Sequence, residues 1–237
     1  MTKILMFAGQ IGSGKSYIVS KKAQELKEVG NSVLMLSFAD PIKKFIKDVI
    51  GVDKHSINAH VENMNLSLPF EKFVSAFLDK FNRHPMKYVS MIQFKEQYEK
   101  CIEDLNSQYE NDVFSRGVRG LYQLVGTDMA QSLNKEMWPI CLMNTLQPIL
   151  DDVHIDYVLI DDWRFIFEYF SNLRNFSDCE VIPYFVTASD DTRALRRGIS
   201  FEELKIQSQH VSERESNEVI FNWMKIYFPD NMIINEG

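Results

Sequence analysis

Apolar residues near the start of the chain alternate between short continuous runs and helical repeats. Residues 3–8 are almost entirely apolar and are followed by Gly9, which predicts a strand buried on both faces. Between residues 18 and 29 the apolar positions recur at helical spacing, and Gly30 and Asn31 predict the end of that helix. A second apolar run follows at residues 33–38. Strand, helix and strand with short connections form a βαβ unit, which requires a parallel sheet.

The pattern changes after this unit. Asp40 as N-cap and Pro41 as first helical residue predict a helix that runs to Gly51. From residue 52 to 150 we find no convincing strand, and apolar residues at three and four spacing predict helices at 70–81, 88–105, 118–133 and 136–150. Strands are expected again at 156–161, 180–186 and 231–235, and Pro183 makes the strand at 180–186 the weakest of these predictions. Helical segments are expected between the strands at 165–173, 190–197 and 215–227.

We therefore expect an α/β fold with a five-stranded parallel sheet flanked by helices. The whole chain, 1–237, is expected to form a single domain, with residues 1–51 and 151–237 as its core and residues 52–150 as a large helical insertion.

Composition excludes several classes of protein. With 237 residues, of which 45% are hydrophobic, and a net charge of −7, the chain is no coiled coil, collagen or disordered tail. An acidic chain is also a poor match for a protein that coats nucleic acid. The three cysteines form no C-x-x-C pair, so we expect neither a disulfide framework nor a zinc site, and a cytoplasmic setting. The apolar run at the N-terminus is too short for a signal peptide or a membrane span, so no membrane partner is expected.

A phosphate-binding motif lies between the first strand and the first helix. Residues 9–16 are GQIGSGKS and match the full pattern G-x-x-x-x-G-K-[ST]. Glycines let successive N–H groups turn toward a phosphate, Lys15 reaches the β- and γ-phosphates, and the Ser16 hydroxyl ligates Mg²⁺. The candidate ATP-binding residues are Gly9, Gly12, Ser13, Gly14, Lys15 and Ser16. The alternative is a glycine-rich turn that binds no ligand, and it explains poorly why the motif lies between a buried strand and an amphipathic helix.

Polar residues follow the third expected strand. Asp161, Asp162 and Arg164 come directly after it, and ligands of open parallel sheets bind beyond the carboxyl ends of the strands. The carboxylates could orient the waters of Mg²⁺, and the guanidinium could hold an acceptor phosphate through two N–H groups. The alternative is a helix N-cap pair followed by a surface arginine.

Arg193, Arg196 and Arg197 form a local cationic cluster in this acidic chain. They fall on neighbouring helical positions and could close over a triphosphate as part of a lid at about residues 190–213. The alternative is a solvated helix face on which Asp190 and Asp191 are the partners.

Five further segments, in order along the chain, resemble motifs of the P-loop deoxynucleoside monophosphate kinases of bacteriophages, which are related to adenylate, dephospho-CoA and phosphomevalonate kinases. The segments are FADPIK at 38–43, VRGLYQLVGTD at 118–128, DWRFIFE at 162–168, HVSE at 210–213 and NMIINEG at 231–237. The family's tryptophan downstream of the second motif is matched by Trp138, which could equally be a core aromatic. Thr127 and Asp128 could equally bond back to the preceding helical turn.

The resemblance implies roles for individual residues. It implies that Lys15, Ser16 and the glycines hold ATP, with the turn from Asn235 to Gly237 beside the adenine. It implies a metal beside Asp162 and Ser16, and because Asp161 replaces a residue that is usually uncharged, either aspartate could serve that metal. It implies catalytic roles for Lys15, Asp162, Arg164, Arg193, Arg196 and Arg197, and a monophosphate site lined by Asp40, Lys43, Arg119, Gly126, Thr127, Asp128, Trp138, Arg164 and Glu168.

The function implied by the resemblance is transfer of the γ-phosphate of ATP, with Mg²⁺, to a deoxynucleoside 5′-monophosphate in the cytoplasm of a phage host. A related small P-loop kinase, similar to dephospho-CoA kinase, is one alternative. A binding or assembly module that ATP switches without any acceptor is another. The sequence leaves open a homodimer and the bases accepted.

Overall fold

The computed structural model describes residues 1–50, 92–93, 95–97, 99–100, 103, 122, 124–209 and 211–237. By its contacts the chain divides into two units. One unit contains Met1–Phe38 and Leu142–Gly237, and the other contains Ala39–Cys141.

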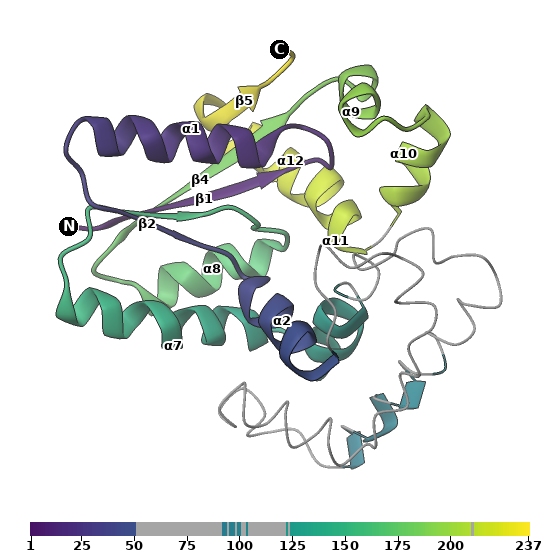
Figure 1. Ribbon diagram of the computed structural model, residues 1–237, viewed down its shortest axis with the longest axis horizontal. Helices are drawn as coiled ribbons and strands as arrows, with labels where there is room; N and C mark the ends of the chain where they lie inside the picture. Colours follow the sequence, from purple (N-terminus) through teal and green to yellow (C-terminus); the bar gives the residue numbers. More distant parts are fainter. Residues whose placement is uncertain are drawn as a thin grey trace. The chain divides into compact units, whose positions relative to one another are not determined.

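A five-stranded parallel sheet forms the centre of the first unit (Figure 1). Its strands are β1 (Lys3–Gly9), β2 (Val33–Leu36), β3 (Tyr157–Ile160), β4 (Glu180–Thr187) and β5 (Met232–Ile234), in the order β2-β3-β1-β4-β5. All neighbouring pairs are parallel. The α/β class and the five expected strands are thus confirmed, with strand ends that differ by no more than two residues from those predicted. Since β1 is the central strand, the segment that follows it leaves from the middle of the sheet's carboxyl edge.

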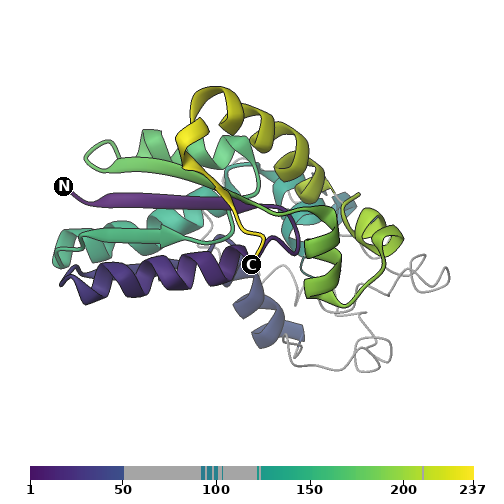
Figure 2. The ribbon, with the colours of Figure 1, turned by 90° about the horizontal axis from the view of Figure 1, so that it is seen from above.

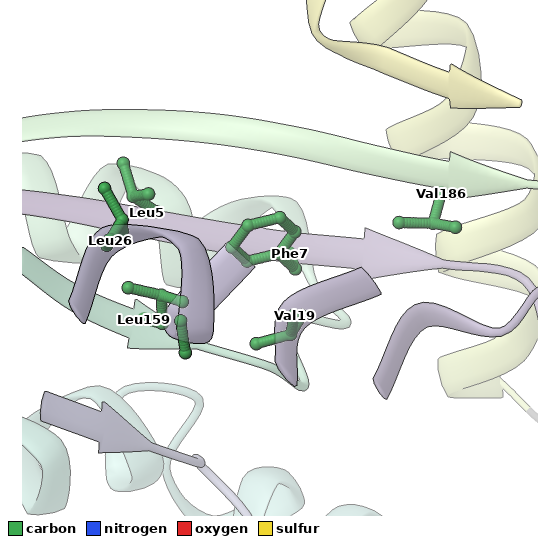
Figure 3. Packing of buried hydrophobic residues seen from close by; sticks show 7 residues of the cluster. Leu5, Phe7, Val19, Leu26, Leu159 and Val186 are labelled. Atoms are coloured by element: carbon green, nitrogen blue, oxygen red, sulfur yellow. The ribbon is translucent and has the colours of Figure 1, made fainter. Parts of the chain in front are cut away.

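The helix α1 (Lys15–Glu28) covers one face of this sheet and was predicted from its apolar repeat. Its buried residues pack against alternate residues of β1 and against β3 and β4 (Figure 3). The cluster contains Leu5, Phe7, Val19, Ala23, Leu26, Leu159 and Val186. This burial fixes the start of α1 at the end of the glycine-rich segment, where Lys15 and Ser16 are its first two residues.

The opposite face is covered by α8 (Ile166–Asn175) and α12 (Phe221–Tyr227) (Figure 2). Aromatic side chains of these two helices contact each other. The ring centroid of Trp223 lies 5.1 Å from that of Tyr169 and 6.1 Å from that of Trp163. Phe185 of β4 meets Phe221 at 5.4 Å. The other helices that lie wholly within this unit are α9 (Asp190–Arg197), α10 (Phe201–Gln207), α11 (Val211–Arg214), the π-helix η4 (Glu215–Ile220) and the 3-10 turn η5 (Pro229–Asn231).

Pro183 lies inside β4 despite its missing N–H group. The neighbouring strand β5 pairs only with Phe185–Thr187, so β4 has a free edge at the proline. Proline is tolerated at such an edge because no ladder hydrogen bond is lost there. The carbonyl of Pro183 accepts a hydrogen bond of 2.9 Å from the side chain of Asn231.

The second unit is helical where the structure describes it. It contains α2 (Asp40–Phe45), η1 (Ile46–Ile50), η3 (Leu124–Gln131) and the start of α7 (Met137–Asp152), which continues into the first unit. Our N-cap assignment for α2 was wrong: Ala39 is the N-cap, and Asp40 is already helical and pairs with Lys43 at 3.0 Å. The helix predicted at 70–81 lies outside the described residues, as does most of that at 88–105.

Among the helices that the structure describes, none is long and apolar enough to cross a membrane.

Candidate functional site

The motif GQIGSGKS forms a tight loop between β1 and α1. Gly12 and Gly14 have φ angles of +80° and +79°, a region that residues with a Cβ rarely adopt, and Gly14 is the N-cap of α1. A Cβ on Gly12 would also lie 2.8 Å from the carbonyl oxygen of Arg193. The N–H of Ser13 turns back to the carbonyl of Gln10 at 3.0 Å. Such a loop at a helix N-terminus can bind an anion through backbone N–H groups.

Side chains from distant parts of the chain hold the carbonyl groups of this loop. Arg193 Nε donates to Ile11 O at 2.8 Å, and Asn235 Nδ2 and Arg196 Nη1 donate to Ser13 O at 2.9 and 3.2 Å. Arg193 is buried, with 4% of its surface exposed, and also donates to Asp190 at 2.6 Å. The loop is therefore fixed by α9 and by the segment after β5 as well as by its own glycines.

Lys15 is the half-buried first residue of α1. Its ammonium group makes no ion pair with any residue in the described part of the chain, so it can meet a ligand. Burial lowers the pKa of Lys15, while the carboxylates of Asp161 and Asp162 oppose this. Ser16, the next residue, is exposed and offers its hydroxyl at the first turn of the helix.

Asp161, Asp162 and Arg164 follow β3 at the same edge of the sheet, close enough to Lys15 to affect its charge. Asp162 accepts 2.6 and 2.7 Å hydrogen bonds from Ser37 Oγ and Phe38 N, so it ties the end of β2 to the end of β3. Asp161 is partly exposed. The N-cap alternative for these aspartates is wrong, because Phe165 is the N-cap of α8.

Arg164 forms an ion pair with Glu213 of α11, with 2.6 Å between Nη1 and Oε1. The side chain of Glu213 is only 3% exposed, whereas that of Arg164 is 39% exposed. Burial on its own lowers the pKa of Arg164, but the carboxylates of Glu213 and Asp162 outweigh it and raise that pKa, so the guanidinium is always charged. Our sequence analysis assigned no role to Glu213, although it ends the segment HVSE.

Glu168 lies behind the site rather than in it, contrary to our expectation of a substrate ligand. It is 2% exposed and accepts hydrogen bonds from the backbone N–H groups of Arg164 and Phe165, at 2.9 and 3.1 Å. These two contacts satisfy backbone N–H groups at the start of α8, where the N-cap Phe165 has no side-chain acceptor of its own. Burial raises the pKa of Glu168 to about 8.

The three arginines of α9 have different environments. Arg193 is internal, and Arg196 donates to the carbonyls of Asn235 and Gly237 at 2.9 and 3.3 Å. Arg197 is exposed and forms no hydrogen bond within the described residues. The alternative of a solvated helix face therefore holds for Arg197 but not for Arg193. Glu236 completes the contact between α9 and the segment after β5 by accepting from Ser189 N at 2.7 Å and Thr192 Oγ1 at 2.8 Å.

The other residues expected at a monophosphate site belong to the second unit. Gly126 packs closely on Ile42, and its carbonyl accepts a 2.9 Å hydrogen bond from the indole of Trp138. Trp138 is 3% exposed, which favours the core-aromatic alternative.

Asp40 and Lys43 are exposed, and Thr127 and Asp128 are half-buried. The backbone carbonyl of Asp128 accepts from Ser132 Oγ at 2.6 Å, a bond within one helical segment. Arg119 lies outside the described residues.

No family model matches this chain, and no curated protein matches it. In the part of the chain that the structure describes, no group of three or more His, Cys, Asp or Glu could hold a metal ion by itself. The oxygen groups of Ser16, Asp161 and Asp162 would suit Mg²⁺, which proteins bind through one or two carboxylates together with the phosphates of a nucleotide.

Proposed function

We propose that this protein is a nucleotide kinase that transfers the γ-phosphate of ATP to a deoxynucleoside 5′-monophosphate. One arrangement carries the proposal: a glycine-rich loop with Lys15 lies at the same sheet edge as Arg164, whose side chain is 39% exposed, with Asp161 and Asp162 nearby. A donor phosphate site and a second anion site at one edge are what phosphoryl transfer between two polyanions needs.

The donor side rests on the loop. Gly12 and Gly14 give it a shape that only glycine adopts freely, and Lys15 supplies a cation without an ion-pair partner in the described residues. Ser16 and one of the two aspartates would hold Mg²⁺, which neutralises charge on the phosphates when it is bound. Ser37 Oγ and Phe38 N donate to the two oxygens of Asp162, which fixes the orientation of that carboxylate.

The acceptor side rests on Arg164, because a guanidinium can hold a phosphate through two parallel N–H groups. The attacking phosphate oxygen is already ionised at neutral pH, so the reaction needs positioning and charge neutralisation rather than a strong general base. The choice of a deoxynucleoside monophosphate comes from the family resemblance of the motifs at 38–43, 118–128 and 162–168.

Among the arginines of α9, Arg197 is the candidate for a lid, because it is exposed while Arg193 and Arg196 hold the glycine-rich loop and the segment after β5. A lid would exclude water and limit hydrolysis of ATP when no acceptor is bound.

A coupled assay of ADP release tests the proposal. Mg-ATP is supplied with dAMP, dCMP, dGMP, dTMP, the ribonucleotide counterparts or dephospho-CoA, or with no acceptor, and Lys15→Met serves as the blank. We expect release that depends on a deoxynucleoside monophosphate. Release that only dephospho-CoA supports would reassign the acceptor, and tight ATP binding without any acceptor-dependent release would favour an ATP-switched module instead.

A further inference from the structure

Glu213 is a buried carboxylate at the cationic end of the site. Its side chain is 3% exposed, and its charge acts on Lys15, Arg164 and Arg193. Only Arg164 is hydrogen-bonded to it among these three cations. A buried carboxylate is costly unless a cation compensates it. Arg164 supplies this compensation for Glu213, and its own position is fixed by the contact.

The contact uses one particular edge of the guanidinium. Glu213 takes the Nη1 group, while Nε and Nη2 of Arg164 make no hydrogen bond with any residue that the structure describes. Nε and Nη2 form the edge on which a phosphate or carboxylate binds through two parallel N–H groups. The side chain as a whole is 39% exposed, so it is only partly enclosed although Nη1 is held.

Two backbone contacts complete the support of Arg164. Glu168 accepts from the N–H groups of Arg164 and Phe165, which fixes the main chain where the arginine begins. The side chain of Arg164 is thus held at its base by α8 and at its tip by α11, and little conformational freedom is left to be lost when a ligand binds.

We propose that Glu213 is a positioning residue for the acceptor phosphate: it holds Nη1 of Arg164 so that the Nε–Nη2 edge is preset to bind the monophosphate. This inference rests on the proposed kinase function and deepens it. It also connects α11, at the end of the segment that begins with the arginine-bearing helix α9, to the acceptor side of the site.

The test compares steady-state kinetics of the wild-type protein with Glu213→Ala and Glu213→Gln, using dAMP, dCMP, dGMP and dTMP in turn. Without the carboxylate Arg164 loses its preset position, so Glu213→Ala should raise the KM of the acceptor by about tenfold and change that of ATP by less than about twofold. Glu213→Gln retains an oxygen that can accept from Nη1 and should recover part of the loss. Glu218→Ala is the matched control, since Glu218 is an exposed carboxylate on the adjoining η4 helix.

A double-mutant cycle separates positioning from a general structural role. If Glu213 acts through Arg164, adding Glu213→Ala to Arg164→Ala should change the acceptor KM by less than about twofold. Equal increases in both KM values, or effects of the two substitutions that add fully, would overturn the inference and leave the kinase assignment intact. A wild-type protein that shows no acceptor-dependent ADP release would overturn both. If Glu213→Ala does not fold, the same comparison is made with Glu213→Gln, where an unchanged acceptor KM would contradict the inference.

Discussion

Arg193 Nε lies 2.8 Å from the carbonyl oxygen of Ile11, so a buried arginine 182 positions further along the chain holds the middle of the phosphate loop. The same side chain is bonded to Asp190 within α9. An arginine of this kind supports a binding loop without touching the ligand, whereas Arg197, four residues later, is exposed. The two arginines should therefore respond differently to substitution.

Replacement of Arg193 by alanine should weaken ATP binding because it leaves Ile11 O without this donor and loosens the loop. We expect the dissociation constant for ATP to rise by about tenfold or more, together with a lower melting temperature. Arg197→Ala should leave both nearly unchanged and affect turnover alone. Isothermal titration calorimetry and thermal unfolding measure these effects. Equal ATP affinities for the two variants would contradict the role of Arg193 in holding the loop.

Replacement of Gly12 by alanine should abolish tight ATP binding. The substitution introduces both left-handed strain at φ +80° and a contact of 2.8 Å with Arg193 O. Gly30 offers a matched control, because its φ is +89° but nothing lies within 4 Å of an added Cβ. Gly30→Ala should cost only the strain, roughly 1–2 kcal/mol of unfolding free energy, and leave ATP affinity intact. ATP titrations of both variants separate the two effects; loss of affinity in Gly30→Ala would contradict this explanation.

Replacement of Lys15 by methionine should lower turnover by about 10²-fold or more, which corresponds to roughly 2.7 kcal/mol of transition-state stabilisation. Lys15 is the cation of the phosphate loop and pairs with no described residue. Lys21→Met removes a cation from the exposed face of the same helix and should have little effect. The acceptor-dependent ADP assay measures both, and activity retained in Lys15→Met would remove the basis of the proposed function.

Replacement of Arg164 by alanine should destabilise the fold because it removes the ion-pair partner of the buried Glu213. Since the side chain of Arg164 is 39% exposed, we expect the free energy of unfolding to fall by about 1–3 kcal/mol, which is less than for a fully buried pair. The double variant Arg164→Ala with Glu213→Gln should regain part of this stability, because the remaining side chain is uncharged. Urea unfolding of the single and double variants tests this, and a double variant less stable than Arg164→Ala would contradict it.

The stability contribution of Glu168 should depend on pH. Its pKa is about 8 in the folded protein, raised chiefly by burial, against 4.5 as the ordinary value. The folded state therefore binds a proton that the unfolded state has released, and stability falls as the pH rises from about 4.5 to about 8.

Glu168→Gln keeps an acceptor for the two N–H groups and removes this titration. The unfolding free energy of Glu168→Gln, relative to that of the wild type, should rise by on the order of 2 kcal/mol between pH 6 and pH 9. Glu202→Gln, on the exposed face of α10, controls for the change in net charge. Urea midpoints at both pH values measure the difference, and a constant difference between Glu168→Gln and wild type would refute the assignment.

Local sequence pattern was sufficient to predict the sheet and the glycine-rich turn between β1 and α1. β1 and α1 follow from apolar spacing over a few residues, and the glycines of the loop have positive φ angles that a motif can encode. The position of Asp161, Asp162 and Arg164 followed from a general property of parallel sheets, whose carboxyl ends meet at one edge.

Contacts between distant segments could not be predicted in this way. The pair Arg164 and Glu213 spans 49 positions, and nothing in the local pattern of either residue identifies its partner. The resemblance to the family motif implied a ligand role for Glu168, but its buried carboxylate accepts from the backbone N–H groups of Arg164 and Phe165 at the start of α8. Since Phe165 offers no side-chain acceptor, the usual S/T-x-x-E pattern of a capping box is absent and does not identify this role from the sequence.

The central position of β1 has a consequence for how the protein opens. β1 pairs with β3 on one side and β4 on the other, and its residues from Ile4 to Ala8 are at most 2% exposed. Backbone amides in such a strand exchange their hydrogens with solvent only when the whole fold opens, whereas edge strands and helix ends exchange through local fluctuations. The glycine-rich loop therefore starts from the segment that should be the slowest to exchange, so its first residues stay fixed while the periphery of the protein opens and closes.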